Sequence, residues 1–230
     1  MKKYRHIFFD LDRTLWDFDR NSRETLTELF YRYSLDGRIG NPDDFVDAYH
    51  EINLQLWDLY RNGLMTKEIL RTQRFIMSFD RFGIRDDAMA ERFGEEYLEL
   101  SPAKTILVPH ASEILEYLSP AYGLHIITNG FQKTQQVKLK NCRLDRYFRS
   151  LTTSEEVGHN KPRPEIFQRA LSSVNARKEE SLMVGDDLEV DILGARRFGF
   201  DQVFLNREGL EHSEPVTYEI RTLLELKELL

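Results

Sequence analysis

The chain of 230 residues is 41% hydrophobic and 31% charged, which is typical of a folded globular protein and excludes a disordered one. Its formal net charge of −7 excludes the broad basic surface with which proteins bind nucleic-acid polymers or anionic membranes. The sequence lacks a run of about 18 apolar residues, so we expect no membrane span. The single cysteine, Cys142, cannot form an internal disulfide, and we therefore expect a cytoplasmic protein.

The first predicted element is a buried strand at 6–9, which is followed at once by two carboxylates, Asp10 and Asp12, and then by Thr14. In open parallel sheets, ligands bind beyond the carboxyl ends of the strands, which is where these acids lie. Two carboxylates so close repel each other unless a cation or a shared proton relieves them. The pattern therefore indicates a functional site, and a solvent-facing turn with two acids is the alternative.

The following interval, from about 18 to 102, contains no convincing strand. Its apolar spacing and its helix-start and helix-stop signals predict four helices, at 22–33, 43–61, 66–82 and 86–98. A crossover between two parallel strands needs only one helix. Four helices in succession therefore indicate an inserted helical domain.

Beyond this insert, strand-like and helix-like segments alternate. We expect strands at 124–127, 151–153, 182–184 and 203–205. We expect helices at 111–118, from Pro164 onward, at 187–198 with Asp187 as its cap and Gly199 as its stop, and at 218–230. The alternation predicts an α/β protein with a doubly wound, Rossmann-like parallel sheet. Residues 1–17 and 102–230 would form this core, and residues 18–101 the all-helical insert.

Polar side chains follow four of the predicted strands at their carboxyl ends. They are Asp10 and Asp12, then Thr128 and Asn129, then Lys161 at a distance, then Asp186 with Asp191 further on. In this topology they converge on one crevice. Read singly, each has an ordinary alternative: Thr128 and Asp186 could cap helices, and Lys161 could be a surface lysine.

Taken together, these groups meet the needs of phosphoryl transfer to a carboxylate. A carboxylate nucleophile forms an aspartyl-phosphate and divides one difficult displacement into two easier ones. Because nucleophile and phosphate are both anionic, a hard divalent cation such as Mg²⁺ is expected between Asp10 and Asp186. Thr128 and Lys161 can donate to the phosphoryl oxygens, and Asp12 can act as general acid and then as general base.

The same pattern resembles the haloacid dehalogenase-like superfamily of phosphohydrolases: Asp10-x-Asp12-x-Thr14, Thr128, Lys161, and Gly185-Asp186 followed by Asp191. The helical insert is similar in position to that superfamily's helical cap. The resemblance implies that Asp10 is the nucleophile and a metal ligand and that Asp12 binds metal through its backbone carbonyl. It further implies that Asp186 is a metal ligand, that Thr14 and Asp191 are supporting residues, and that Thr128, Asn129 and Lys161 bind substrate.

A narrower resemblance is to the bacterial pyrimidine 5'-nucleotidases of the YjjG type. It rests on segments 126–131, 135–137, 154–158, 161–162 and 191–194 in the predicted core, and on segments 53–57, 60–63 and 74–75 in the insert. It implies a nucleoside monophosphate as the small-molecule partner. Two positions depart from the superfamily pattern, Arg13 and Asp187, and neither removes a catalytic group. Aromatic residues at 16, 57, 60 and 131 could stack on a nucleobase or belong to a core.

Three rivals stay open at this point. A sugar-phosphate phosphatase or a phosphomutase of the same superfamily would use the same core and differ in the insert. A dehalogenase would need neither a metal nor the second acid, Asp12. A phospho-receiver signalling domain also holds an aspartate, a threonine and a lysine. Its phosphorylated aspartate is expected on a middle strand, whereas Asp10 follows the first, and such a domain is expected to have no large helical insert. The sequence does not specify an oligomeric state.

Overall fold

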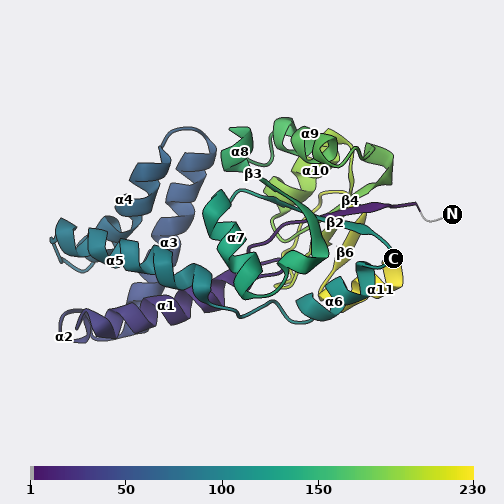
Figure 1. The fold of residues 1–230 in the computed structure, drawn as a ribbon. Helices are drawn as coiled ribbons and strands as arrows, with labels where there is room; N and C mark the ends of the chain where they lie inside the picture. The colour runs from purple at the N-terminus through teal and green to yellow at the C-terminus, as the bar shows by residue number, and fades with distance from the viewer. Residues whose placement is uncertain (1–2) are drawn as a thin grey trace. The chain divides into compact units, whose positions relative to one another are not determined.

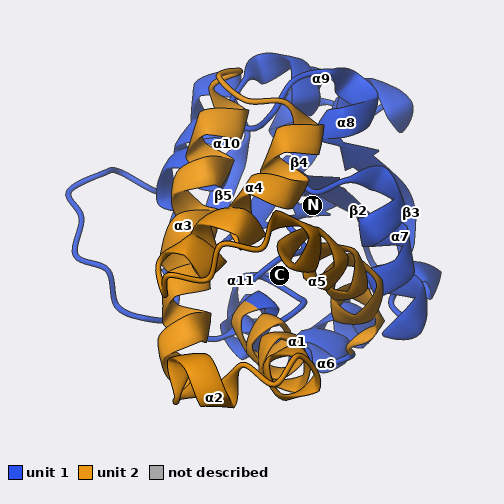
Figure 2. Cartoon of the chain, turned by 90° about the vertical axis from the view of Figure 1, so that its left-hand side faces the viewer, with its two compact units in different colours: residues 1–18, 105–230 blue, residues 19–104 orange. Residues whose placement is uncertain are grey.

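The computed structural model describes residues 3–230 and divides into two compact units (Figure 2). One unit contains the described residues up to Phe18 together with Thr105–Leu230, and the other contains Asp19–Lys104. The boundaries expected from the sequence lay at 17/18 and 101/102. None of the helices within residues 3–230 combines the length and the apolar surface that a membrane crossing needs.

The first unit is built on a six-stranded sheet in which every pair of neighbouring strands is parallel. The strands are β1 (His6–Phe9), β2 (Gly123–Thr128), β3 (Phe148–Thr153), β4 (Ser181–Gly185), β5 (Asp201–Leu205) and β6 (Tyr218–Ile220). Their order is β3-β2-β1-β4-β5-β6. The chain thus runs outward from β1 in one direction and then returns to build β4 on its other side. The predicted α/β class with a doubly wound sheet is confirmed.

Helices cover both faces of this sheet, because the strands are apolar on both sides. Successive residues of β1 point to opposite faces. Ile7 and Phe9 pack in one cluster with α6 (Ala111–Leu118), α7 (Gln132–Asn141) and α11 (Leu226–Leu229). Phe8 packs in the opposite cluster with α9 (Pro164–Ser173) and α10 (Gly194–Phe198). In Figure 1, α6 and α11 lie side by side near the C-terminus.

Turn and cap residues end these elements as the sequence indicates. The Asp187 side chain accepts hydrogen bonds from the backbone of Glu189 and Val190 and so caps the helical segment that follows. That segment is π-helical over Leu188–Leu193 and continues as α10 to Phe198. Gly199 stops it in the left-handed region, with φ at 102°. The predicted cap and stop are both confirmed.

The prediction of one helix at 218–230 is wrong. The segment begins with the edge strand β6, continues through a 3₁₀ turn at Leu223–Glu225, and ends in the short helix α11. Thr222 and Glu225 form a reciprocal capping box that starts the helical part there. The apolar spacing that suggested a helix instead places Ile220, Leu223 and Leu226 in the core beneath the sheet.

The second unit is entirely helical. Its helices are α1 (Phe18–Arg32, whose first residue belongs to the other unit), α2 (Asp36–Ile39), α3 (Pro42–Arg61), α4 (Lys67–Asp80) and α5 (Asp87–Leu100), followed by a 3₁₀ turn at Ser101–Ala103. Side chains of Asn41, Thr66 and Asp86 cap α3, α4 and α5. Aromatic residues dominate its own core, among them Phe45, Phe75 and Phe93. The four predicted helices are present, and the short α2 was not predicted.

Candidate active site

The four strands β3, β2, β1 and β4 are adjacent in the sheet, and polar residues follow each of them at its carboxyl end. β1 is followed by Asp10, β2 ends on Thr128, and β4 is followed by Asp186. Lys161 lies in the connection after β3. Because β1 lies where the direction of strand succession reverses, this edge is the expected ligand crevice of a doubly wound sheet.

The loop after β1 is fixed by apolar anchors and by hydrogen bonds. Leu11, Leu15 and Trp16 are fully buried, and the backbone amides of Leu15 and Trp16 both donate to the carbonyl of Leu11. This tight loop directs the Thr14 hydroxyl to Asp186 Oδ1, at 2.8 Å. Thr14, expected as a supporting residue, thus orients an acid that lies 172 positions away along the chain.

Lys161 connects two acids at the centre of the site. Its Nζ lies 2.5 Å from Asp10 Oδ1 and 2.7 Å from Asp191 Oδ1, and it also donates to the carbonyl of Ile127 at 2.9 Å. The lysine is only 1% exposed, so its charge depends on these partners rather than on water. A surface position for Lys161 is therefore excluded.

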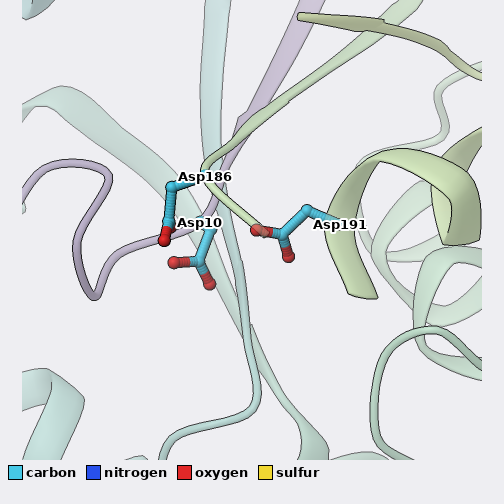
Figure 3. Close-up of side chains that lie close together, drawn as sticks. All are labelled: Asp10, Asp186 and Asp191. Atoms are coloured by element: carbon cyan, nitrogen blue, oxygen red, sulfur yellow. The ribbon is translucent and has the colours of Figure 1, made fainter. Parts of the chain in front are cut away.

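Three carboxylates gather around this point and fit a divalent metal ion. Oxygens of Asp10, Asp186 and Asp191 lie within 4.8 Å of one another, and Figure 3 shows the three side chains together. Three carboxylates and one ammonium leave a formal charge of −2, which a divalent cation would balance. All of these donors are oxygens, which suits Mg²⁺. Asp191, expected only as a supporting residue, belongs to the same cluster.

Burial and mutual repulsion perturb the pKa values of the acids in this cluster. Burial raises the pKa of Asp10 well above its usual range, and the charge of Lys161 only partly opposes this. Burial, together with the negative charge of Asp191, raises the pKa of Asp186 to about 7. Burial would lower the pKa of Lys161, but the two carboxylates beside it raise that pKa above its ordinary value. Strongly perturbed acids in one crevice are typical of functional sites.

Gly185 leaves space for the three-carboxylate cluster. A Cβ on Gly185 would lie 2.3 Å from Asp191 Oδ2, far inside contact distance. Only glycine therefore allows the end of β4 and the Asp191 carboxylate to approach so closely.

Asn129, expected to bind substrate, holds Lys161 in place. Its Nδ2 donates to the carbonyl of Lys161 at 3.1 Å, and its Oδ1 accepts from the backbone N–H of the same residue at 2.7 Å. Ser154 in turn donates to the carbonyl of Asn129 at 3.0 Å. Both the oxygen and the nitrogen of the Asn129 amide are thus hydrogen-bonded to the backbone of Lys161.

Asp12 lies outside the three-carboxylate cluster and contacts α7 instead. Its Oδ1 pairs with Lys138 Nζ at 2.5 Å, and its Oδ2 accepts from Gln135 Nε2 at 2.8 Å. The same Gln135 nitrogen donates to Thr128 Oγ1 at 2.7 Å. The two predicted residues Asp12 and Thr128 are thereby joined by one amide group.

Gln135 and Lys138 were not predicted as site residues from the sequence. A signal was available, since the segment that becomes α7 has too few apolar residues to bury an apolar face. Its buried residues are Gln135, Lys138 and Leu139, two of them polar. A helix that packs through polar side chains needs polar partners.

The four aromatic residues considered as nucleobase contacts are buried or half-buried. Trp16 and Phe131 are buried among core residues, and Trp57 packs edge-on against Tyr60 within α3.

Comparison with known proteins identifies the family of the chain. A sequence profile of haloacid dehalogenase-like hydrolases matches residues 4–199. The pyrimidine 5'-nucleotidase YjjG of Escherichia coli is 36% identical over 231 residues, covering 99% of this chain and 98% of that protein. A glyceraldehyde 3-phosphate phosphatase of Pyrococcus furiosus is 30% identical, covering 100% of this chain and 94% of that protein.

A solved structure is similar over nearly the whole chain. The HAD-hydrolase YfnB of Bacillus subtilis, crystallised with magnesium, superposes with a TM-score of 0.89 at 29% identity and covers 99% of both chains. The resemblance inferred from the sequence motifs is confirmed. On the profile match and on the full-length relatives, this chain belongs to the haloacid dehalogenase-like hydrolases.

Proposed function

We propose that the protein is a Mg²⁺-dependent phosphomonoester hydrolase that acts through an aspartyl-phosphate on Asp10. The observation that carries the proposal is the buried cluster in which Lys161 joins Asp10 to Asp191, beside Asp186. Such a site supplies a carboxylate nucleophile, a fixed cation and an oxygen donor set in one place. Asp10, Asp186 and Asp191, with the backbone carbonyl of Asp12, would hold the metal. A bound Mg²⁺ would neutralise charge between the nucleophile and the phosphoryl oxygens.

In the first step, a carboxylate oxygen of Asp10 attacks the phosphorus, and the bond from phosphorus to the leaving alcohol oxygen breaks. Asp12, in its acid form, gives its proton to that oxygen, so the alcohol departs neutral. Lys161 Nζ and the Thr128 hydroxyl donate to the phosphoryl oxygens as their charge develops.

In the second step, Asp12, now a carboxylate, takes a proton from water as that water attacks the phosphorus. The bond between Asp10 and phosphorus breaks, which releases inorganic phosphate and restores both carboxyl groups. A dehalogenase has no need of this second acid, so Asp12 favours phosphate ester hydrolysis.

We further propose that the leaving alcohol is a nucleoside and that pyrimidine 5'-monophosphates are preferred. The support is the 36% identity with a pyrimidine 5'-nucleotidase over 99% of this chain, a match that spans the helical unit as well as the core. The helical unit would then act as a cap that selects the leaving group. A sugar-phosphate phosphatase is the second candidate, and the glyceraldehyde 3-phosphate phosphatase among the relatives favours it.

A substrate panel with and without EDTA tests these proposals. UMP, dUMP, dTMP and hexose phosphates would be compared by phosphate release in Mg²⁺. We expect kcat/KM for the pyrimidine nucleotides to exceed that for hexose phosphates by about tenfold or more, a difference of about 1.4 kcal/mol in transition-state binding. EDTA should abolish turnover. Preference for the sugar phosphates would support the second candidate, and activity unaffected by EDTA would contradict the metal-dependent mechanism.

A further inference from the structure

Helix α7 presents two buried polar side chains to the active-site loop, one turn apart. Gln135 is fully buried and Lys138 is 5% exposed, and both contact the Asp12 carboxylate. Residues three apart lie on the same face of a helix, which explains how both reach one carboxylate. Each oxygen of Asp12 thus has its own donor.

Lys138 is itself held from a second side. Its Nζ lies 4.1 Å from the centre of the Trp16 ring, and Trp16 is fully buried. A cation placed over an indole face is attracted to it and loses freedom of movement. Lys138 is therefore a fixed group rather than a flexible surface lysine.

Gln135 determines the direction of the Thr128 hydroxyl. A hydroxyl oxygen has two acceptor positions and one hydrogen to donate. Thr128 Oγ1 accepts from Gln135 Nε2 at 2.7 Å and from the Gly130 backbone N–H at 3.0 Å. Both acceptor positions are filled, so the hydroxyl hydrogen remains to be donated to another acceptor, and a phosphoryl oxygen is such an acceptor.

The orientation of the Gln135 amide is itself determined. While Asp12 is a carboxylate, an amide oxygen facing it would set two acceptors against each other without a hydrogen between them, so the Gln135 nitrogen faces the ionised form of Asp12. Gly130 leaves the space for this arrangement, because a Cβ there would lie 2.2 Å from Gln135 Nε2. The turn after β2 and helix α7 are thus fitted to each other around this amide.

We infer that Gln135 and Lys138 are positioning residues: Lys138 and Gln135 hold the Asp12 carboxylate in place, and Gln135 also aims the Thr128 hydroxyl at the phosphoryl group. This inference rests on the proposed function for its catalytic consequence. It assigns the two residues different effects. Lys138 acts through the acid and base group alone, whereas Gln135 acts also through a phosphate-binding hydroxyl.

The two effects separate when the leaving group is varied. Departure of a nucleoside alkoxide needs the proton of Asp12, whereas p-nitrophenolate is stable enough to leave without one. Lys138→Met, which keeps the apolar stem, should lower kcat on UMP by about 30- to 100-fold and kcat on p-nitrophenyl phosphate by about threefold or less. Lys138→Arg should restore activity on UMP to within about fivefold, because arginine also pairs with a carboxylate and stacks on indole.

Gln135→Met, of similar length, should impair both substrates. We expect kcat/KM to fall by about tenfold or more on UMP and on p-nitrophenyl phosphate alike, since Thr128 serves the phosphoryl group in either ester. Exposed residues of the same helix provide matched controls, Lys140→Met and Gln136→Met, and both should match the wild type within about twofold. Equal losses on both substrates in Lys138→Met, or unchanged activity in either buried variant, would overturn the inference.

A crystal structure of each variant tests the positions without relying on turnover. In Lys138→Met and Gln135→Met, the Asp12 side chain should leave its present position or occupy more than one rotamer, while Asp10 and Lys161 stay in place. If Asp12 keeps its conformation in both variants, the inference is wrong whatever the enzyme does. If the wild type hydrolyses neither ester but Asp12 moves as expected, the proposed function fails and the positioning role stands.

Discussion

The ammonium nitrogen of Lys161 lies 2.5 Å from a carboxylate oxygen of Asp10, although 151 positions separate the two residues in the chain. Asp191 lies on the other side of the same nitrogen, at 2.7 Å. Neither acid could remain charged at this depth without a cation. The pairing therefore couples the stability of the core to the chemistry proposed for it.

Removal of this lysine should destabilise the protein as well as inactivate it. Lys161→Met leaves two buried carboxylates without their cation, and breaking a buried pair in this way costs about 3–5 kcal/mol. Urea unfolding in EDTA should show that loss, while the exposed Lys133→Met should unfold like the wild type. An unchanged free energy of unfolding in Lys161→Met would mean that the ion pairs of Lys161 do not stabilise the fold.

Magnesium should stabilise the folded protein through the three-carboxylate cluster. A ligand at about 100 times its dissociation constant raises the free energy of unfolding by about 2.7 kcal/mol. Asp186→Asn removes one charged oxygen donor, so this variant should gain much less at the same Mg²⁺ concentration. Thermal unfolding with a Mg²⁺ titration measures both effects. Equal shifts in the wild type and in Asp186→Asn would place the metal elsewhere.

His125 should make stability depend on pH. It is fully buried in β2, with ring nitrogens 3.0 Å from His6 Nδ1 and 2.9 Å from Ser150 Oγ. Burial lowers the pKa of His125 to about 3, and the charges of His6 and Arg149 act in the same direction. In the unfolded chain the His125 ring binds a proton near pH 6.5, whereas in the folded chain it stays neutral down to about pH 3. Stability contributed above pH 6.5 is therefore lost progressively as the pH falls toward 3.

The variant His125→Gln isolates this effect. Between pH 7 and pH 4.5, the wild type should lose about 2–3 kcal/mol more of its free energy of unfolding than the variant does. Urea unfolding at the two pH values measures the difference, and the shared acid sensitivity of the other groups cancels. Parallel losses in both proteins would show that His125 titrates normally.

Two glycines of the helical unit should respond oppositely to alanine. Gly37 lies in α2, and a Cβ there would meet no atom within 4 Å, so Gly37→Ala should stabilise by about 0.5–1 kcal/mol. Gly94 lies in α5, and its Cβ would lie 2.7 Å from the buried ring of Phe75. We expect Gly94→Ala to destabilise by about 1–3 kcal/mol through overpacking. Thermal unfolding of both variants checks the sign, and stabilisation of both would contradict the packing.

The strands that were best predicted from the sequence are those marked by a continuous apolar run. β1 begins and ends where expected, because its apolar residues are bounded by the polar Asp10. Edge strands were harder to predict: β3 begins with exposed or half-buried residues, Phe148 to Ser150, and β6 has only three residues. Such strands lack the continuous apolar signal of a central parallel strand.

The site was predictable in its motif residues but not in its supports. Asp10, Thr128, Lys161 and Asp186 follow strand ends, a relationship visible in the chain. Gln135 and Lys138 are ordinary helix residues by type, and only the tertiary packing of α7 against the active-site loop brings them to Asp12.

The phosphoryl acceptor is the central claim, and Asp10→Asn tests it most directly. The asparagine side chain keeps the shape of aspartate but cannot form an acyl phosphate. With UMP and Mg²⁺, brief turnover followed by borohydride reduction should mark residue 10 in the wild type. In Asp10→Asn, no mark should form, and phosphate release should fall by about a thousandfold or more. Near-normal phosphate release by Asp10→Asn, with the fold intact, would contradict the account.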